Sequence, residues 1–200
     1  MNRKLFAVVM ILAMVLLIPL VALAEESPKA TVEAGVNKVL ATLKDPGFKD
    51  KSKDAQVADL TKVISTIFDF NELSRRTLGR GWRSMNDAQR KEFVDLFTQL
   101  LQGVYADRLL AYSDQKVIFD KENIIKKGQA EVQSYLQTAD GKKIPLFYRL
   151  TDKSGSWKVY DVIIEGVSMV KNYRTQFREI LSKDSPEKLL EILRSKVGKA

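Results

Sequence analysis

The chain has 200 residues, with 33 lysines and arginines against 25 aspartates and glutamates, giving a net charge of +8. It contains neither histidine nor cysteine, which excludes histidine-based acid–base catalysis, a Ser-His-Asp triad, a thiol nucleophile and ordinary zinc sites. We therefore expect a protein without catalytic residues, metal or cofactor, whose stability comes from hydrophobic burial rather than disulfides.

The first 24 residues have the pattern of a secretory signal peptide. Arg3 and Lys4 precede an apolar run from Leu5 to Ile18, and Ala22-Leu23-Ala24 ends the segment as a cleavage site. An uncleaved anchor is the alternative, because the segment is just long enough to cross a bilayer. We expect cleavage and export to the periplasm, which lowers the net charge from +8 to +6 by removing Arg3 and Lys4.

Residues 25–200 are expected to form one domain, which begins with a helical part over residues 30–112. Apolar residues at helical spacing predict helices over 31–43 and 54–68. Asp69 is a candidate N-cap with Glu72 three residues later, and Gly79 ends that helix. Asn86 with Gln89 marks the start of the longest helix, which is expected to end near residue 112.

From residue 115 to residue 165 the hydrophobic period changes to two, which predicts an antiparallel sheet. The expected strands are Lys116–Asp120, Ala130–Thr138, Lys142–Thr151 and Ser156–Glu165. Two helices over 167–183 and 186–197 are expected to complete the C-terminal part, residues 167–198. The order of helices, meander and helices predicts an α+β fold with a four-stranded sheet and about six to seven helices.

The last predicted strand is apolar on both faces. Simple alternation places Trp157, Val159 and Ile163 on one face, and Tyr160, Val162 and Ile164 on the other. A strand that faces solvent on one side would carry polar residues there. The strand is therefore part of a three-layer core, or one face of the sheet lines a cavity.

Three blocks of the chain carry a resemblance to a known family. They are Tyr160-Asp161-Val162 with Ile164-Glu165-Gly166-Val167-Ser168, Asn172-Tyr173-Arg174 and Gln176-Phe177; Phe68-Asp69-Phe70 with Leu78-Gly79 and Gly81-Trp82-Arg83; and Phe93 to Leu109. With these blocks the chain resembles the MlaC family, the periplasmic phospholipid-binding proteins of the maintenance-of-lipid-asymmetry system, also called the toluene-tolerance or auxiliary-transport substrate-binding family. They cover most of the mature chain in the expected order. The resemblance implies a curved sheet wrapped by helices around an apolar lipid pocket.

A large set of apolar residues is available to line such a pocket. The alternative is an ordinary filled core, since buried aromatic and aliphatic residues are what cores contain. Alternation does not tell which face of the last strand lines the pocket, and we expect it to be the face of Tyr160, Val162 and Ile164. The candidates are Phe70, Leu73, Phe97, Leu100, Val104, Val132, Tyr160, Val162, Ile164, Met169 and Tyr173.

Four arginines, Arg75, Arg76, Arg80 and Arg83, form a basic cluster that can contact a lipid headgroup or an acidic docking partner. Alternatively, the first two complement the C-terminus of their helix and the others are solvated. Nucleic acid is not expected as a partner, because the chain is exported and its basic residues show no register with aromatic residues.

Asp161 and Glu165 lie on one face of the last predicted strand, and Arg174 follows in the next helix. An ion pair that fixes the strand to the helix is the expected role. An enzyme that uses Asp161 with Tyr160 or Tyr148 for proton transfer is the alternative. Because neighbouring residues of a regular strand point to opposite faces, Tyr160 and Asp161 are not expected to share one pocket.

The resemblance implies a monomeric carrier whose ligand is phospholipid. Its implied protein partners are an outer-membrane lipoprotein–porin complex and the periplasmic hexameric subunit of an inner-membrane ABC transporter. A periplasmic interaction module or chaperone with an apolar groove is a further alternative. Lipid that co-purifies with the protein would favour the carrier, and peptide would favour the chaperone.

Overall fold

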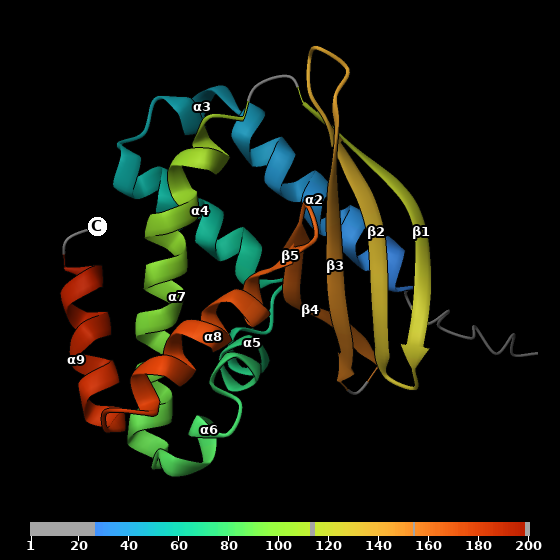
Figure 1. Cartoon of the computed structure of the whole chain (residues 1–200). Coiled ribbons are helices and arrows are strands. Elements are labelled where there is room, and N and C mark those ends of the chain that lie inside the picture. Colours follow the sequence, from blue (N-terminus) through green and yellow to red (C-terminus); the bar gives the residue numbers. More distant parts are fainter. Residues whose placement is uncertain (1–26, 113–114, 154, 199–200) are drawn as a thin grey trace, which may run out of the picture.

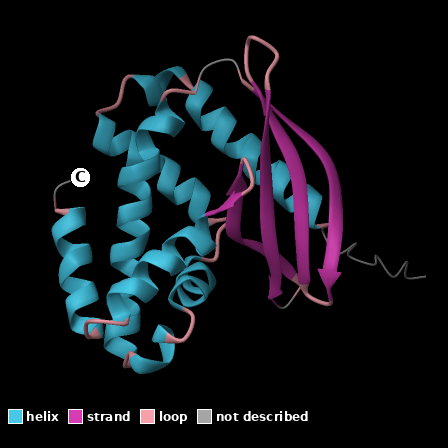
Figure 2. Cartoon of the chain, viewed as in Figure 1, coloured by secondary structure: helices cyan, strands magenta, loops and turns pink. Residues whose placement is uncertain are grey.

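Eight helices and one five-stranded antiparallel sheet make up the residues that the structure, a computed structural model, describes: 27–112, 115–153 and 155–198 (Figures 1 and 2). The predicted signal peptide lies outside these residues. The helices are α2 (Pro28–Lys44), α3 (Pro46–Lys49), α4 (Lys53–Ser65), α5 (Phe70–Leu78), α6 (Gly81–Ser84), α7 (Asp87–Leu110), α8 (Met169–Leu181) and α9 (Pro186–Val197). The strands are β1 (Lys116–Lys126), β2 (Gln129–Gln137), β3 (Lys143–Lys153), β4 (Ser156–Ile164) and β5 (Val167–Ser168).

The helices α5, α7 and α9 begin where the sequence predicts, because a side-chain cap sets each of these starts. In contrast, α2 begins at Pro28 instead of residue 31 and α8 at Met169 instead of residue 167. The Asp69 carboxylate accepts a hydrogen bond from the backbone N–H of Glu72 at 2.8 Å. Asn86 and Gln89 form a complete capping box at the start of α7. The one-turn helices α3 and α6 are too short to give a periodic signal in the sequence.

The sheet has the order β1-β2-β3-β4-β5, so the predicted meander is confirmed and gains one short strand. β5 was missed because it is a two-residue strand directly before α8. β1 continues to Lys126 instead of ending at Asp120, because a bulge between Phe119 and Glu122 interrupts its alternation. On the far side of β4, Phe68 pairs with Val159 and covers part of the edge.

A bulge in β4 corrects the predicted assignment of faces. Arg149 pairs with Asp161 and Leu150 pairs with Val159, which leaves Tyr160 as the extra residue. As a result Val159 and Val162 lie on the same face, toward α2, where both belong to one buried cluster. Tyr160 and Asp161 lie together on the opposite face, so the expectation that they point apart is wrong.

Three separate hydrophobic clusters stabilise the fold. The first joins α5, α7, α8 and α9, the second joins α2 to the sheet, and the third joins the C-terminal half of α2 to α3 and α4. Figure 1 shows α2 lying against the sheet while the other helices gather beyond the β4 side. None of the described helices combines the length and hydropathy needed to cross a bilayer.

Candidate functional site

Hydrophobic residues that are only partly buried lie around the region where the three clusters approach one another. Val36 and Leu40 are one turn apart on α2 and flank the second and third clusters respectively. Met169 packs against both the first and the second cluster. We call this set the apolar junction; its members are Val36, Leu40, Ile64, Leu146, Ile164 and Met169. The junction is the candidate site, because it offers apolar surface that the protein itself does not fully cover.

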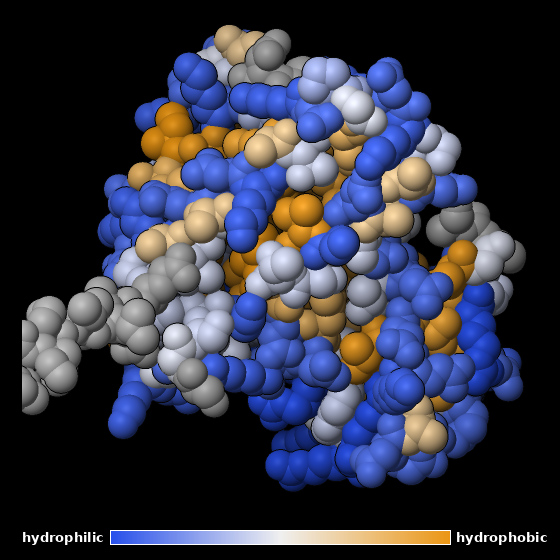
Figure 3. Space-filling view, turned by 180° about the vertical axis from the view of Figure 1, so that it is seen from behind, coloured by the Kyte–Doolittle hydropathy of each residue, from blue (hydrophilic) through white to orange (hydrophobic). Residues whose placement is uncertain are grey.

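The space-filling view supports this description. Figure 3 shows the side opposite to Figure 1, with hydrophobic residues exposed in a recess in the middle and again toward the upper left. Hydrophilic residues surround both places. An apolar recess with a polar border suits a ligand that has a hydrocarbon part and a polar part.

Val104 marks where the close packing of α7 ends. It follows Phe97 by seven residues and Leu101 by three, so all three lie on one face of the helix. The exposed fractions of Phe97 and Leu101 are 0% and 7%, whereas that of Val104 is 45%. One turn beyond the filled core, the inward face of α7 is therefore no longer covered by protein.

Several predicted lining residues lie inside the filled helical core instead. Leu73, Leu100 and Tyr173 are buried in the first cluster. Phe97 is fully buried, and its ring centroid lies 5.0 Å from that of Tyr173. Phe70 is half-buried and stacks on Phe68 at 5.8 Å. Four of these residues thus belong to the filled core and Phe70 lies beside Phe68, which packs against it. Contact of all five with a ligand stays a prediction.

The predicted residues of the sheet divide between its two faces. Val132, Val162 and Ile164 belong to the cluster on the face toward α2, and Met169 packs against the same cluster. Tyr160 lies on the opposite face, where the guanidinium carbon of Arg76 is 3.8 Å from its ring centroid. The expectation that Tyr160 shares a face with Val162 and Ile164 is therefore wrong, and the bulge is the reason.

The face toward α2 is uncharged along the middle of β2 and β3. Ser134 is fully buried there, and its hydroxyl donates a hydrogen bond to the carbonyl of Leu146 at 2.5 Å. Burial raises the pKa of the Tyr148 hydroxyl, so this phenol stays neutral at physiological pH. Tyr148 and Asp161 lie on opposite faces, which removes the geometry that an enzyme using this pair would need. The sheet face toward α2 is therefore suited to contact with hydrocarbon.

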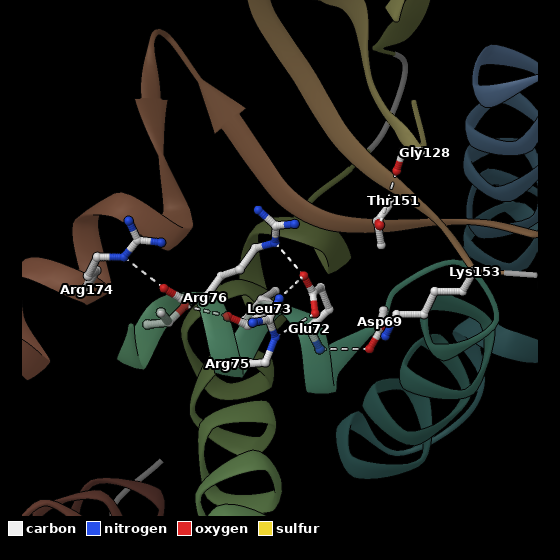
Figure 4. Close-up of polar contacts among 10 residues, drawn as sticks. Asp69, Glu72, Leu73, Arg75, Arg76, Gly128, Thr151, Lys153 and Arg174 are labelled. Atoms are coloured by element: carbon white, nitrogen blue, oxygen red, sulfur yellow. Dashed lines mark hydrogen bonds and ion pairs between the residues drawn. The ribbon is translucent and has the colours of Figure 1, made fainter. Parts of the chain in front are cut away.

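Glu72 binds two of the four clustered arginines, Arg75 and Arg76 (Figure 4). The Glu72 carboxylate accepts hydrogen bonds at 2.7 Å from both the Arg75 and the Arg76 guanidinium. The Arg75 hydrogen bond, with the Arg76 contact, lowers the pKa of Glu72 against the opposing effect of burial. In the described part of the chain, the exposed side chains of Arg80 and Arg83 have no carboxylate partner. These two arginines are free to contact a partner.

The predicted ion pair of Asp161 and Glu165 with Arg174 is not formed. Asp161 accepts hydrogen bonds from the Ser168 hydroxyl at 2.6 Å and from the backbone N–H of Val170 at 3.0 Å. Glu165 is exposed in the turn before β5, and Arg174 donates to the carbonyl of Arg76 at 2.8 Å. Asp161 still joins strand to helix, through the start of α8 rather than through Arg174.

Sequence reasoning missed four junction residues: Val36, Leu40, Ile64 and Leu146. Three of them belong to helical stripes that look the same whether a helix covers a filled core or an open site. Because the signal of a site here is incomplete burial, no sequence pattern could have singled these residues out.

The sequence model of the MlaC protein family matches residues 33–195. The chain belongs to the MlaC family. Among curated relatives of this MlaC-family chain, the intermembrane phospholipid transport system binding protein MlaC of Haemophilus influenzae is 25% identical over 193 residues, covering 94% of this chain and 90% of the relative. Toluene tolerance protein ttg2D of Pseudomonas putida is 25% identical over 168 residues, covering 83% of this chain and 78% of the relative.

A solved structure shares the fold. It is the phospholipid-binding protein of Ralstonia solanacearum in complex with a phospholipid, which superposes with a TM-score of 0.79 at 27% sequence identity. The match covers 86% of this chain and 98% of the solved chain. The α+β architecture of this MlaC-family chain is thus that of a phospholipid-binding protein.

Proposed function

We propose that this MlaC-family chain is a phospholipid carrier that holds the acyl chains of its ligand against the apolar junction. The observation that carries the proposal is the incompletely covered apolar surface between α2, the sheet, α4 and α8, in a fold shared with a phospholipid-bound relative. Family and relative together indicate a lipid-binding protein rather than an enzyme.

The energetics explain why a carrier is needed. A diacyl lipid exposes on the order of thirty methylenes to water, and burying each contributes about 0.8 kcal/mol, so its unaided transfer costs roughly 20 kcal/mol or more. The apolar junction and the uncharged sheet face beside it reduce this cost without any catalytic group. The polar border of the recess leaves the headgroup in contact with water.

Membership of the MlaC family is the support for a proposed role in phospholipid transport between the two membranes. In this proposal the exported domain of residues 25–200 works as a monomer in the periplasm. It exchanges phospholipid with an outer-membrane lipoprotein–porin complex and with the hexameric subunit of an inner-membrane ABC transporter. Energy for directed transport comes from the transporter.

The test is native mass spectrometry of protein purified gently from the periplasm, followed by solvent extraction of whatever is bound. We expect wild-type protein to carry phospholipid. Ile164→Trp places a bulky ring at the junction, and Val104→Trp places one on the uncovered face of α7. Both variants should lose the lipid yet keep a cooperative thermal transition, because an open site accommodates added volume.

Ile67→Trp is the matched control. Ile67 is buried in the filled cluster between α2 and the sheet, so overpacking there should lower the stability by about 1–3 kcal/mol. Wild-type protein without lipid, or bound peptide in place of lipid, would contradict the carrier. The same is true if Val104→Trp and Ile164→Trp unfold as readily as Ile67→Trp.

A further inference from the structure

The end of the β1–β2 hairpin exposes two adjacent isoleucines. The exposed fractions are 59% for Ile124 and 53% for Ile125, near the turn at Lys127 and Gly128. This turn lies at the lower end of the sheet in Figure 1. We call Lys121, Ile124, Ile125, Lys126 and Lys127 the hairpin tip. Two large aliphatic side chains exposed side by side have an unfavourable contact with water that a partner can remove.

The tip is also positively charged. Lys121, Lys126 and Lys127 are exposed, and within the described part of the chain none of them forms an ion pair. Two nearby carboxylates accept hydrogen bonds from backbone groups instead of pairing with these lysines. Glu122 accepts one from the backbone N–H of Lys29 at 2.8 Å. On the adjacent turn, Asp152 accepts one from the backbone N–H of Gly155 at 2.9 Å. The three ammonium groups are therefore available to an anionic partner.

We propose that the hairpin tip docks on the surface of a bilayer that contains anionic phospholipids. Ile124 and Ile125 would enter the boundary between headgroups and acyl chains, and the lysines would lie among the phosphates. A register shift between Ile124 and Lys126 leaves Ile125 as an extra residue of β1, so strict alternation does not separate the two isoleucines. The interface of an anionic bilayer offers hydrocarbon to the isoleucines and phosphates to the lysines at the same place, and this double match favours a bilayer over a protein groove.

This contact is separate from the proposed cargo site. The tip residues belong to none of the three hydrophobic clusters, and the apolar junction contains no residue of β1. Docking through the tip can therefore be lost while cargo binding persists, and the reverse also holds. The inference stands on the exposure and charge of the tip and does not depend on the carrier proposal.

The experiment is vesicle flotation of the mature protein. One set of vesicles is phosphatidylcholine alone, and the other contains about one third phosphatidylglycerol. We expect binding only to the anionic vesicles, and weaker binding as salt rises from about 0.05 M to about 0.5 M. Lys126→Glu with Lys127→Glu should reduce the affinity by about thirtyfold or more, because each lysine near an anionic surface contributes a factor of about five. Ile124→Ser with Ile125→Ser should also abolish flotation.

Matched controls isolate the tip. Lys142→Glu with Lys143→Glu makes the same charge change at the opposite end of the sheet, and Ile118→Ser removes another exposed isoleucine of β1. Both should float like the wild type, and so should Ile164→Trp, whose change lies at the cargo site.

Three results of the vesicle experiment would overturn the proposal. These are wild-type protein that ignores anionic vesicles, tip variants that still bind them, and binding that is lost in Ile164→Trp. Tip-dependent capture on an immobilised acidic peptide without vesicle binding would also overturn it, in favour of a protein partner. Phospholipid content, measured by mass spectrometry on the same preparations, reports the carrier proposal separately.

Discussion

At the scale of single residues, Glu72 holds two of the four clustered arginines in place. Its side chain is nearly buried, and it binds the guanidinium groups of both Arg75 and Arg76. Arg76 in turn covers the ring of Tyr160 in β4. Charge-assisted hydrogen bonds within α5, which are stronger than neutral ones, therefore hold Arg76 in place, and its cation–π contact with Tyr160 links the helix to the sheet.

This arrangement predicts how stability depends on pH. The pKa of Glu72 is held below its ordinary value of 4.5, chiefly by the Arg75 hydrogen bond, so the folded state binds its proton less readily than the unfolded chain. The contribution is present above that ordinary value and is lost as the pH falls through the lowered pKa. Urea unfolding of wild type and Glu72→Gln should therefore show a stability difference that shrinks with acidification. A pH-independent difference would contradict this, and Glu179→Gln, an exposed site, serves as the control.

Residues whose partners are near in sequence were predictable. Asp69 with Glu72 and Asn86 with Gln89 are caps that close within three residues, and the structure confirms both. Asp161 was not assigned correctly, because its partners depend on how β4 meets the start of α8. Local hydrogen bonds follow from sequence spacing, whereas contacts between elements depend on register and packing.

At the scale of elements, the bulge at Tyr160 decides which residues of β4 face α2. Strict alternation divides the apolar residues of the strand between two faces, but the bulge shifts the pattern and brings Val159 and Val162 to the same face. No residue type marks the bulge in advance, because Tyr160 is an ordinary strand residue. The element could therefore be predicted from the sequence and its orientation could not.

The close approach of α2 to Ile67 gives a prediction at this scale. A methyl group on Gly35 would lie 2.4 Å from the Cδ1 atom of Ile67, so α2 approaches this closely only because position 35 has no side chain. Gly35→Ala should lower the free energy of unfolding by about 1–3 kcal/mol despite its better helix propensity. Ile67→Val removes the clashing methyl, so the double variant should recover part of the loss. Additive effects in the double-mutant cycle would contradict the close contact.

At the scale of the whole molecule, the described residues pack into three modest hydrophobic cores. The predicted ligand-lining residues were chosen for being apolar and for lying in matching blocks. Leu73 and Phe97 proved to be filled core, and Ile164 and Met169 proved to lie at the apolar junction. Both groups have the same chemistry. What separates them is how completely the other elements cover them, which is a property of the assembled fold.

The last prediction concerns association with an acidic protein partner. The structure shows which of the four arginines can be reversed to test it. Reversing Arg76 would break its contacts with Glu72 and Tyr160 and thus lower stability, which would confuse any binding measurement. Arg80 and Arg83 are exposed near α6 and can be reversed without such a loss. Because the expected mature chain carries +6, we expect attraction over a long range to speed the encounter.

Arg80→Glu with Arg83→Glu should slow association with the hexameric transporter subunit by about tenfold at low salt, and it should flatten the salt dependence of the rate. Thermal stability and bound lipid should stay as in the wild type. Lys49→Glu with Lys62→Glu, which makes the same charge change on α3 and α4, separates a local contact from an effect of net charge. Equal slowing in both variants would mean that only the total charge matters, and unchanged rates would remove the arginines from the docking surface.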